Sequence, residues 1–219
     1  RVSRKDSRHQ TKKMKANLLI LILISSVLNG QSIINTSAIS HDLDSSLSLV
    51  LDVGADFSRG NSSMNDISSS FGLGKIVTKD ASIWLLGGYN ELSVNGETQQ
   101  QASYGHLRWN HEVNERVTVN AYGQIQSNRV LEINSRIITG LNLDLDFGKA
   151  EGFMVAVGAF QEMEKYQDGI SSSLIRGNIV AVSEYNTARV ETVGFAYFQP
   201  SLTNPRDYRC IGELSLRSL

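Results

Sequence analysis

Hydrophobic and polar residues alternate between residues 131 and 147 with three exceptions. Seven of the nine odd-numbered positions in this stretch are apolar, whereas the eight even-numbered positions hold one apolar residue, Ile138. A period of two predicts a β-strand with one apolar face and one polar face. At about 3.3 Å per residue the stretch would extend over roughly 55 Å, which is longer than an ordinary globular strand and sufficient to cross a bilayer at a tilt.

The same alternation recurs along the chain and predicts ten strands. Connections after the second, fourth, sixth and eighth strands are expected to be tight, and those after the first, third, seventh and ninth to be longer and more polar, including loops at 93–99 and 162–172. Outer-membrane barrels combine short periplasmic turns with longer outside loops. We therefore expect an all-β fold, an antiparallel up-and-down transmembrane β-barrel. Its strands are predicted at residues 47–58, 67–77, 82–92, 100–110, 117–125, 131–147, 153–159, 174–183, 189–199 and 208–219.

A soluble β-sandwich or lipocalin-like barrel would also alternate apolar and polar residues. In such a protein the apolar face points inward and the strands run about 5 to 6 residues. Here the predicted strands repeatedly exceed ten residues, and the polar face carries several charges. The pattern favours the membrane barrel.

The first thirty residues have the form of an export signal. The first methionine, Met14, is followed by Lys15, an apolar run from Leu18 to Ile24 and a small-residue exit at Asn29-Gly30. This order of basic, apolar and small segments predicts a secretory signal peptide at 14–30. We interpret 1–13 as upstream read-through or an expression remnant, 31–46 as a periplasmic lead-in, and 47–219 as the barrel domain.

Charge and cysteine content narrow the class of protein. Residues 1–30 hold seven of the 21 Lys+Arg and one of the 22 Asp+Glu, so residues 31–219 carry a formal net charge of −7. An acidic exported chain offers no electrostatic footprint for nucleic acid. The single cysteine, Cys210, cannot form an intramolecular disulfide. Export without disulfides points to the envelope of a Gram-negative bacterium, and we expect the chain in its outer membrane.

The predicted strand faces assign two groups of side chains to places in the barrel, one to its lumen and one to its rim. Charged residues on the polar faces are expected to line the barrel lumen, either as an ionic plug or along a solute path with a mild cation preference. The plug is favoured because a barrel of ten to twelve strands has a narrow interior. Aromatic residues near the periplasmic rim are expected to form a girdle. The lumen residues are Asp52, Asp56, Glu132, Arg136, Asp144 and Asp146; the girdle residues are Trp84, Trp109, Phe147 and Phe153.

Several short motifs resemble one known family. They are LDVGADFSRGNSS at 51–63, YGHLRWN at 104–110, YGQIQSN at 122–128, Arg136 with Gly140, and Gly158 with the Glu-Met-Glu of 162–164. The chain resembles the salt-induced outer-membrane protein family, domain-of-unknown-function family four-eight-one. The resemblance implies an outer-membrane β-barrel and brings no catalytic residues with it. Members usually continue into further strands beyond the position of Leu219, so we expect these ten strands to be truncated from about twelve. A complete ten-stranded barrel is the alternative, because its even strand number would also place both termini in the periplasm.

Motifs for catalysis or metal binding are weak. His106 and His111 are five residues apart, which places them on opposite faces of a regular strand. Glu162 and Glu164 share a strand face, but the predicted loop would leave them solvated. Residues 72–75 (Gly-Leu-Gly-Lys) lack the spacing of a phosphate-binding loop. We therefore expect no enzyme, no catalytic residue, no metal and no cofactor.

Taken together, these features predict a monomeric, porin-like outer-membrane β-barrel that is structural or related to envelope stress, or forms a narrow pore. Its expected partners are membrane lipid and lipopolysaccharide, with no nucleic acid. Two alternatives are a soluble periplasmic lipocalin-like binding barrel and a membrane-embedded lipid hydrolase. The hydrolase would need a His–Ser pair near the outer rim, whereas His106 falls toward the periplasmic side.

Overall fold

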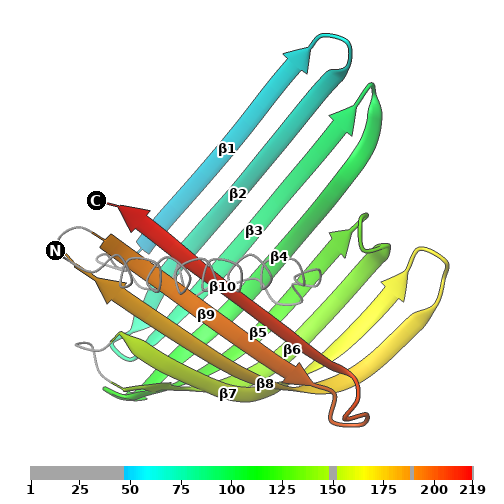
Figure 1. Cartoon of the computed structure of the whole chain (residues 1–219). Helices are drawn as coiled ribbons and strands as arrows, with labels where there is room; N and C mark the ends of the chain where they lie inside the picture. The colour runs from blue at the N-terminus through cyan, green and yellow to red at the C-terminus, as the bar shows by residue number, and fades with distance from the viewer. Residues whose placement is uncertain (1–46, 148–151, 188–189, 219) are drawn as a thin grey trace, which may run out of the picture. The chain divides into compact units, whose positions relative to one another are not determined.

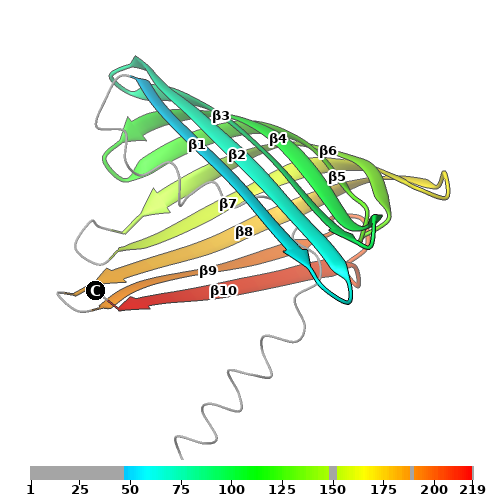
Figure 2. The ribbon, with the colours of Figure 1, turned by 90° about the horizontal axis from the view of Figure 1, so that it is seen from above.

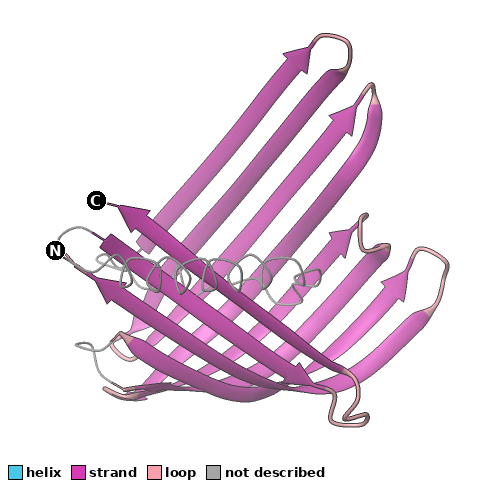
Figure 3. Cartoon of the chain, viewed as in Figure 1, coloured by secondary structure: helices cyan, strands magenta, loops and turns pink. Residues whose placement is uncertain are grey.

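The computed structural model describes residues 47–147, 152–187 and 190–218 of the 219-residue chain. The described residues form ten strands and the short connections between them (Figures 1 and 3). The predictions for residues 1–13, 14–30 and 31–46 lie outside the described residues. The strands are β1 (Leu47–Arg59), β2 (Ser63–Thr78), β3 (Ala81–Val94), β4 (Glu97–Asn114), β5 (Val117–Asn128), β6 (Ile133–Asp146), β7 (Phe153–Tyr166), β8 (Ser171–Asn186), β9 (Val190–Pro200) and β10 (Tyr208–Ser218).

All ten strands belong to one antiparallel sheet. Each strand is hydrogen-bonded to its neighbours in sequence, so the order in the sheet is β1 through β10 without a crossover. The sheet curls and remains open, with β1 and β10 at its two ends (Figure 2). The prediction of an all-β, up-and-down sheet of ten strands is confirmed.

Two of the long polar loops predicted from the sequence are wrong. Strands β3 and β4 continue through residues 93–99 and turn at Asn95 and Gly96 alone, which have φ angles of 52° and 83°. Such positive values at both central residues suit a tight hairpin turn. Likewise, β7 continues to Tyr166 and β8 begins at Ser171. The polar residues in these stretches belong to strands. The third connection is therefore no longer than the second or the fourth, and the expected alternation of loop lengths does not hold there.

The two faces of the sheet have opposite polarity. Large apolar side chains are exposed on the outer face, such as Leu107, Ile125 and Leu141, the last of which is 62% exposed. Polar side chains are buried on the inner face, among them Gln124 and Asn178. In a water-soluble protein the buried face would be the apolar one. This inverted arrangement is the main physical property of the sheet.

The inner face also holds apolar clusters. Tyr122, Ile138 and Phe160 pack together in the middle of the sheet. A second cluster lies on β7, β8, β9 and their neighbours, and it contains Ala156, Val180, Val182, Phe195 and Tyr197. The interior therefore alternates between packed hydrophobic zones and polar zones.

The alternation that predicted β6 breaks at the beginning of the strand. The strand starts at Ile133 rather than at Leu131, and Ile133 is 3% exposed, on the same buried face as Arg136. Register shifts between Gln126 and Asn128 on β5 and between Ile133 and Ser135 on β6 mark an irregularity. One extra residue in a strand reverses the face of every side chain beyond it. The predicted placement of Ile133 on the apolar outer face is therefore wrong, and Leu131 lies in a turn outside the strand.

Candidate functional site

A ladder of buried amides crosses the inner face. Asn120 pairs with Asn142, and Asn142 with Gly158, in neighbouring strands. The Asn178 side-chain amide donates to Asn142 Oδ1 at 3.1 Å, and the Gln199 amide donates to Asn178 Oδ1 at 3.2 Å. The bond between β6 and β8 passes over β7 because Gly158 has no side chain there: a Cβ would lie 2.1 Å from Asn142 Oδ1.

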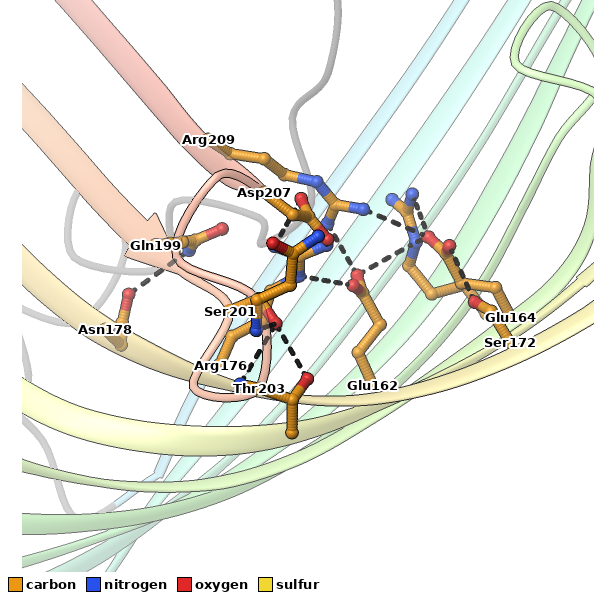
Figure 4. A network of polar contacts seen from close by, with 12 residues as sticks. Glu162, Glu164, Ser172, Arg176, Asn178, Gln199, Ser201, Thr203, Asp207 and Arg209 are labelled. Carbon is orange, nitrogen blue, oxygen red and sulfur yellow. Dashed lines mark hydrogen bonds and ion pairs between the residues drawn. The ribbon is translucent and has the colours of Figure 1, made fainter.

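A cluster of buried ion pairs occupies the inner face near the β7–β8 and β9–β10 connections (Figure 4). At its centre is Glu162, which is 0% exposed. Its carboxylate contacts three arginines: Arg136 Nε at 3.3 Å, Arg176 Nε at 2.8 Å and Arg209 Nη1 at 2.6 Å. The name "ion cluster" is used below for Arg136, Glu162, Glu164, Arg176, Asp207 and Arg209.

The remaining members complete the charge balance. Glu164 is bonded to Arg136 and accepts from the Tyr166 hydroxyl, and Arg209 Nη2 lies 3.4 Å from its carboxylate. Asp207 accepts two hydrogen bonds from Arg176, at 3.0 and 2.9 Å. Three guanidinium groups therefore face three carboxylates. The paired hydrogen bonds from Arg176 to Asp207 are of the bidentate kind, which is among the stronger hydrogen-bonding arrangements in proteins.

The ion cluster connects strands that are not neighbours in the sheet. Arg209 on β10 reaches Glu162 and Glu164 on β7, although β8 and β9 lie between them in the hydrogen-bonded order. The side chains therefore extend across the hollow of the curled sheet. Around them, Ser201 is buried and its backbone N–H donates to the Asp207 carbonyl, which fixes the β9–β10 connection over the cluster. The ion pairs therefore join β7, β8 and β10 at this end of the strands.

Of the six residues predicted to line a lumen, the structure brings only Arg136 into the ion cluster. Asp144 and Asp146 lie half-buried on β6, while Asp52 and Asp56 are exposed on β1. Glu132 lies in the β5–β6 connection with a φ of 56° and is exposed, so its predicted position within a strand is wrong.

The sequence interpretation missed five of the six cluster residues. Glu162 and Glu164 were expected to be solvated at the start of a loop, and that expectation is wrong because β7 continues past both. The sequence did contain a signal that the strand continues. Phe160, Glu162 and Glu164 occupy every second position, with Gln161 and Met163 between them. The contacts with Arg176, Asp207 and Arg209 depend on how strongly the sheet curls, which a strand pattern does not specify.

The four predicted girdle aromatics divide between the two faces. Trp84 is 3% exposed and packs on the inner face, where a Cβ at Gly74 would lie 2.7 Å from its ring. Its assignment to an exposed girdle is therefore wrong, because its ring fills the space that Gly74 leaves on β2. Trp109 is 39% exposed and stacks on His111. Phe147 and Phe153 form an exposed pair with ring centroids 5.8 Å apart.

An open apolar groove of about 710 Å³ lies on the outer face. Small residues on the middle strands, Ala121, Gly123 and Ala159, form part of its lining, with the larger Trp109 and Ile175 beside them. The groove contains no cluster of polar groups arranged for chemistry.

Two other candidate sites suggested by the sequence are His106 and residues 72–75. His106 is buried and stacks on Tyr122, and its Nδ1 lies 3.1 Å from Gln124 Oε1. Residues 72–75 lie within β2. Within 47–147, 152–187 and 190–218, no group of three or more His, Cys, Asp or Glu residues is placed to hold a metal ion. No helix in the described part of the chain has the length and apolar character needed to span a membrane.

The fold and the ion cluster define a class: a ten-stranded antiparallel meander with an apolar exposed face and an ion-paired buried face. Residues 51–218 match the family model described as "Protein of unknown function, DUF481". The chain belongs to this family. No curated protein matches it.

Proposed function

We propose that the chain is a non-enzymatic β-barrel of the bacterial outer membrane, with its interior obstructed by the ion cluster. The observation that carries the proposal is the inverted polarity of the sheet. Leu141 and Leu143 are exposed on the same strand that buries Arg136 and Asn142. Exposed apolar bands are favourable where the surrounding medium is hydrocarbon rather than water.

The strand lengths support the same proposal. The strands contain 11 to 18 residues, whereas a tilted strand crosses the hydrocarbon core with about 9 to 11. The groove beside Ala121 and Gly123 is apolar and open, so acyl chains can fill it. The partners of such a protein are membrane lipid and lipopolysaccharide, and one copy of the sheet supplies the complete ion cluster.

The role of the interior follows from the ion cluster. Charges that neutralise each other across a narrow space leave little room or driving force for solute passage. We therefore assign the protein a structural or stress-related role in the envelope, with at most a narrow, obstructed pore.

Lipid exposure of the apolar face is the decisive test. Single spin labels at Leu141 and Leu143 are placed in the full Cys210→Ser chain, so that the native cysteine takes no label, and the chain is refolded into phospholipid vesicles. A matched label is placed at Asn142. The two leucine positions should be relaxed by oxygen dissolved in lipid, and Asn142 should be shielded from it. If instead Leu141 and Leu143 are shielded and the chain remains in solution without detergent, the membrane proposal is overturned in favour of a soluble binding barrel.

A further inference from the structure

Five adjacent polar side chains on β4 and β5 each leave a buried atom without a hydrogen-bond partner among the described residues. These atoms are His106 Nε2, Arg108 Nε, Asn110 Oδ1, Asn120 Nδ2 and the Tyr122 hydroxyl oxygen. His106 and Asn120 are each 1% exposed, and Tyr122 is 6% exposed. The great majority of buried polar groups in proteins have a partner, so a concentration of unsatisfied atoms in one place requires a physical reason.

The five side chains form one continuous patch on the inner face. His106, Arg108 and Asn110 occupy every second position of β4 and therefore face the same side. In the pairing of β4 with β5, Arg108 lies directly opposite Tyr122, and Asn110 lies directly opposite Asn120. Directly opposed residues have Cβ atoms about 4.5 to 5.5 Å apart. The name "polar patch" is used below for these five residues.

Arg108 gives the polar patch a positive charge. The three arginines of the ion cluster all pair with carboxylates, whereas Arg108 forms no ion pair within the described residues. The residues directly opposite Arg108 are Trp84 on β3 and Tyr122 on β5, both buried. Charges attract more strongly beside such rings than in water, because the local dielectric constant is lower. Arg108 itself is half-buried, so an anion can approach it from the hollow of the sheet.

The unsatisfied atoms include both donors and acceptors. His106 Nδ1 lies 3.1 Å from Gln124 Oε1, to which it can only donate. In the neutral imidazole this leaves His106 Nε2 as an acceptor, and Asn110 Oδ1 is an acceptor as well. The donors are Arg108 Nε, Asn120 Nδ2 and the Tyr122 hydroxyl. A ligand that satisfies this set carries a negative charge and also a hydroxyl group.

We propose that the polar patch binds a small hydroxycarboxylate anion. The carboxylate accepts hydrogen bonds from Arg108 and Tyr122, and the hydroxyl group donates to Asn110 or His106 on either side of the arginine. A planar guanidinium matches the geometry of a carboxylate. Asp144, half-buried on the inner face of β6, disfavours ligands with more than one negative charge. This binding site goes beyond the proposed function, because every residue of the polar patch lies on the face turned away from the membrane.

Trp84 can report binding, because it lies directly opposite Arg108. The chain has two tryptophans, so emission from the full-length Trp109→Phe chain comes from Trp84 alone. This chain is titrated at constant pH and ionic strength with sodium glycolate, sodium acetate or glycolamide. Glycolate should change the emission saturably. Acetate lacks the hydroxyl group and should bind several-fold more weakly, and the uncharged glycolamide should produce no saturable change.

Variants made in the Trp109→Phe chain locate the site. Arg108→Gln should weaken glycolate binding at least tenfold, because charge-assisted hydrogen bonds are lost. Tyr122→Phe removes only a hydroxyl group and should weaken binding roughly tenfold, so it provides the test if Arg108→Gln does not fold. Arg116→Gln is the matched control, since Arg116 is exposed in the β4–β5 connection, and its glycolate affinity should be unchanged.

Each outcome decides the proposal. Saturable glycolate binding that is weakened by Tyr122→Phe or Arg108→Gln and unchanged by Arg116→Gln upholds it. No saturable change with glycolate, an equal response to glycolamide, or undiminished binding in Tyr122→Phe and in a folded Arg108→Gln chain overturns it. Acetate that binds as tightly as glycolate overturns the role given to the ligand hydroxyl. The titration is made in whichever medium the chain folds, detergent or buffer, so its result is independent of the lipid-exposure test of the proposed function.

Discussion

The guanidinium of Arg209 on β10 lies 2.6 Å from the carboxylate of Glu162 on β7, across two intervening strands of the sheet. Contacts within a β-sheet are usually made with adjacent strands. This one spans the hollow of the curled sheet, so it links the curvature of the whole sheet to the charge balance of the ion cluster.

Loss of the central carboxylate should destabilise the fold strongly. Glu162→Gln leaves three arginines with an unequal number of carboxylates, and removing one partner of a buried ion pair costs about 3 to 5 kcal/mol. Arg209→Met should cost less, because Arg209 is 22% exposed and can be replaced by solvent. The free energy of unfolding in urea, measured in lipid vesicles, shows which of the two variants loses more stability.

The control for this series is Lys79→Ala. Lys79 and Asp80 form an exposed pair, with side chains 89% and 45% exposed, and such pairs contribute about 0 to 1 kcal/mol. If Glu162→Gln unfolds at the same urea concentration as Lys79→Ala, then the ion cluster does not stabilise the fold.

Neutralising the two glutamates should also change ion passage. The double variant Glu162→Gln/Glu164→Gln leaves three arginines facing Asp207, so the ion cluster becomes positively charged. In planar bilayers the parent protein should show little conductance, and the variant should show larger conductance with a preference for chloride over potassium. Glu97→Gln, at the exposed beginning of β4, should leave conductance unchanged. Equal conductance of parent and double variant would mean that the ion cluster does not obstruct the interior.

The period-two pattern was sufficient to predict the number and order of the strands, because each strand has one apolar face. It was not sufficient at Ile133, where a local irregularity reverses the faces, or at Trp84, whose burial depends on Gly74 of the neighbouring strand. The ion cluster escaped prediction for a related reason. Glu162, Arg176 and Arg209 come from three strands, and their contact depends on the curl of the sheet.

The amide bond over β7 predicts a sensitive glycine. In Gly158→Ala the new methyl would lie 2.1 Å from both Asn142 Oδ1 and the Leu141 carbonyl oxygen. Because one of these atoms belongs to the backbone, the strands must shift, and overpacking of this kind costs about 1 to 3 kcal/mol. Gly123→Ala is the control, since nothing lies within 4 Å of its added Cβ. Urea unfolding should separate the two variants, and equal midpoints would contradict the close approach.

The two tryptophans offer an optical test of which face touches lipid. Trp109 is 39% exposed on the outer face, whereas Trp84 is 3% exposed on the inner face. In vesicles made with brominated acyl chains, emission from Trp84→Phe, which retains Trp109, should be strongly quenched because bromine quenches by contact. Emission from Trp109→Phe should be quenched much less, since the Trp84 ring is covered by the sheet at Gly74. Both variants keep one indole and exchange one ring for another, so each serves as the control for the other. Stronger quenching of Trp84 than of Trp109 would reverse the assignment of the two faces and contradict lipid contact by the apolar one.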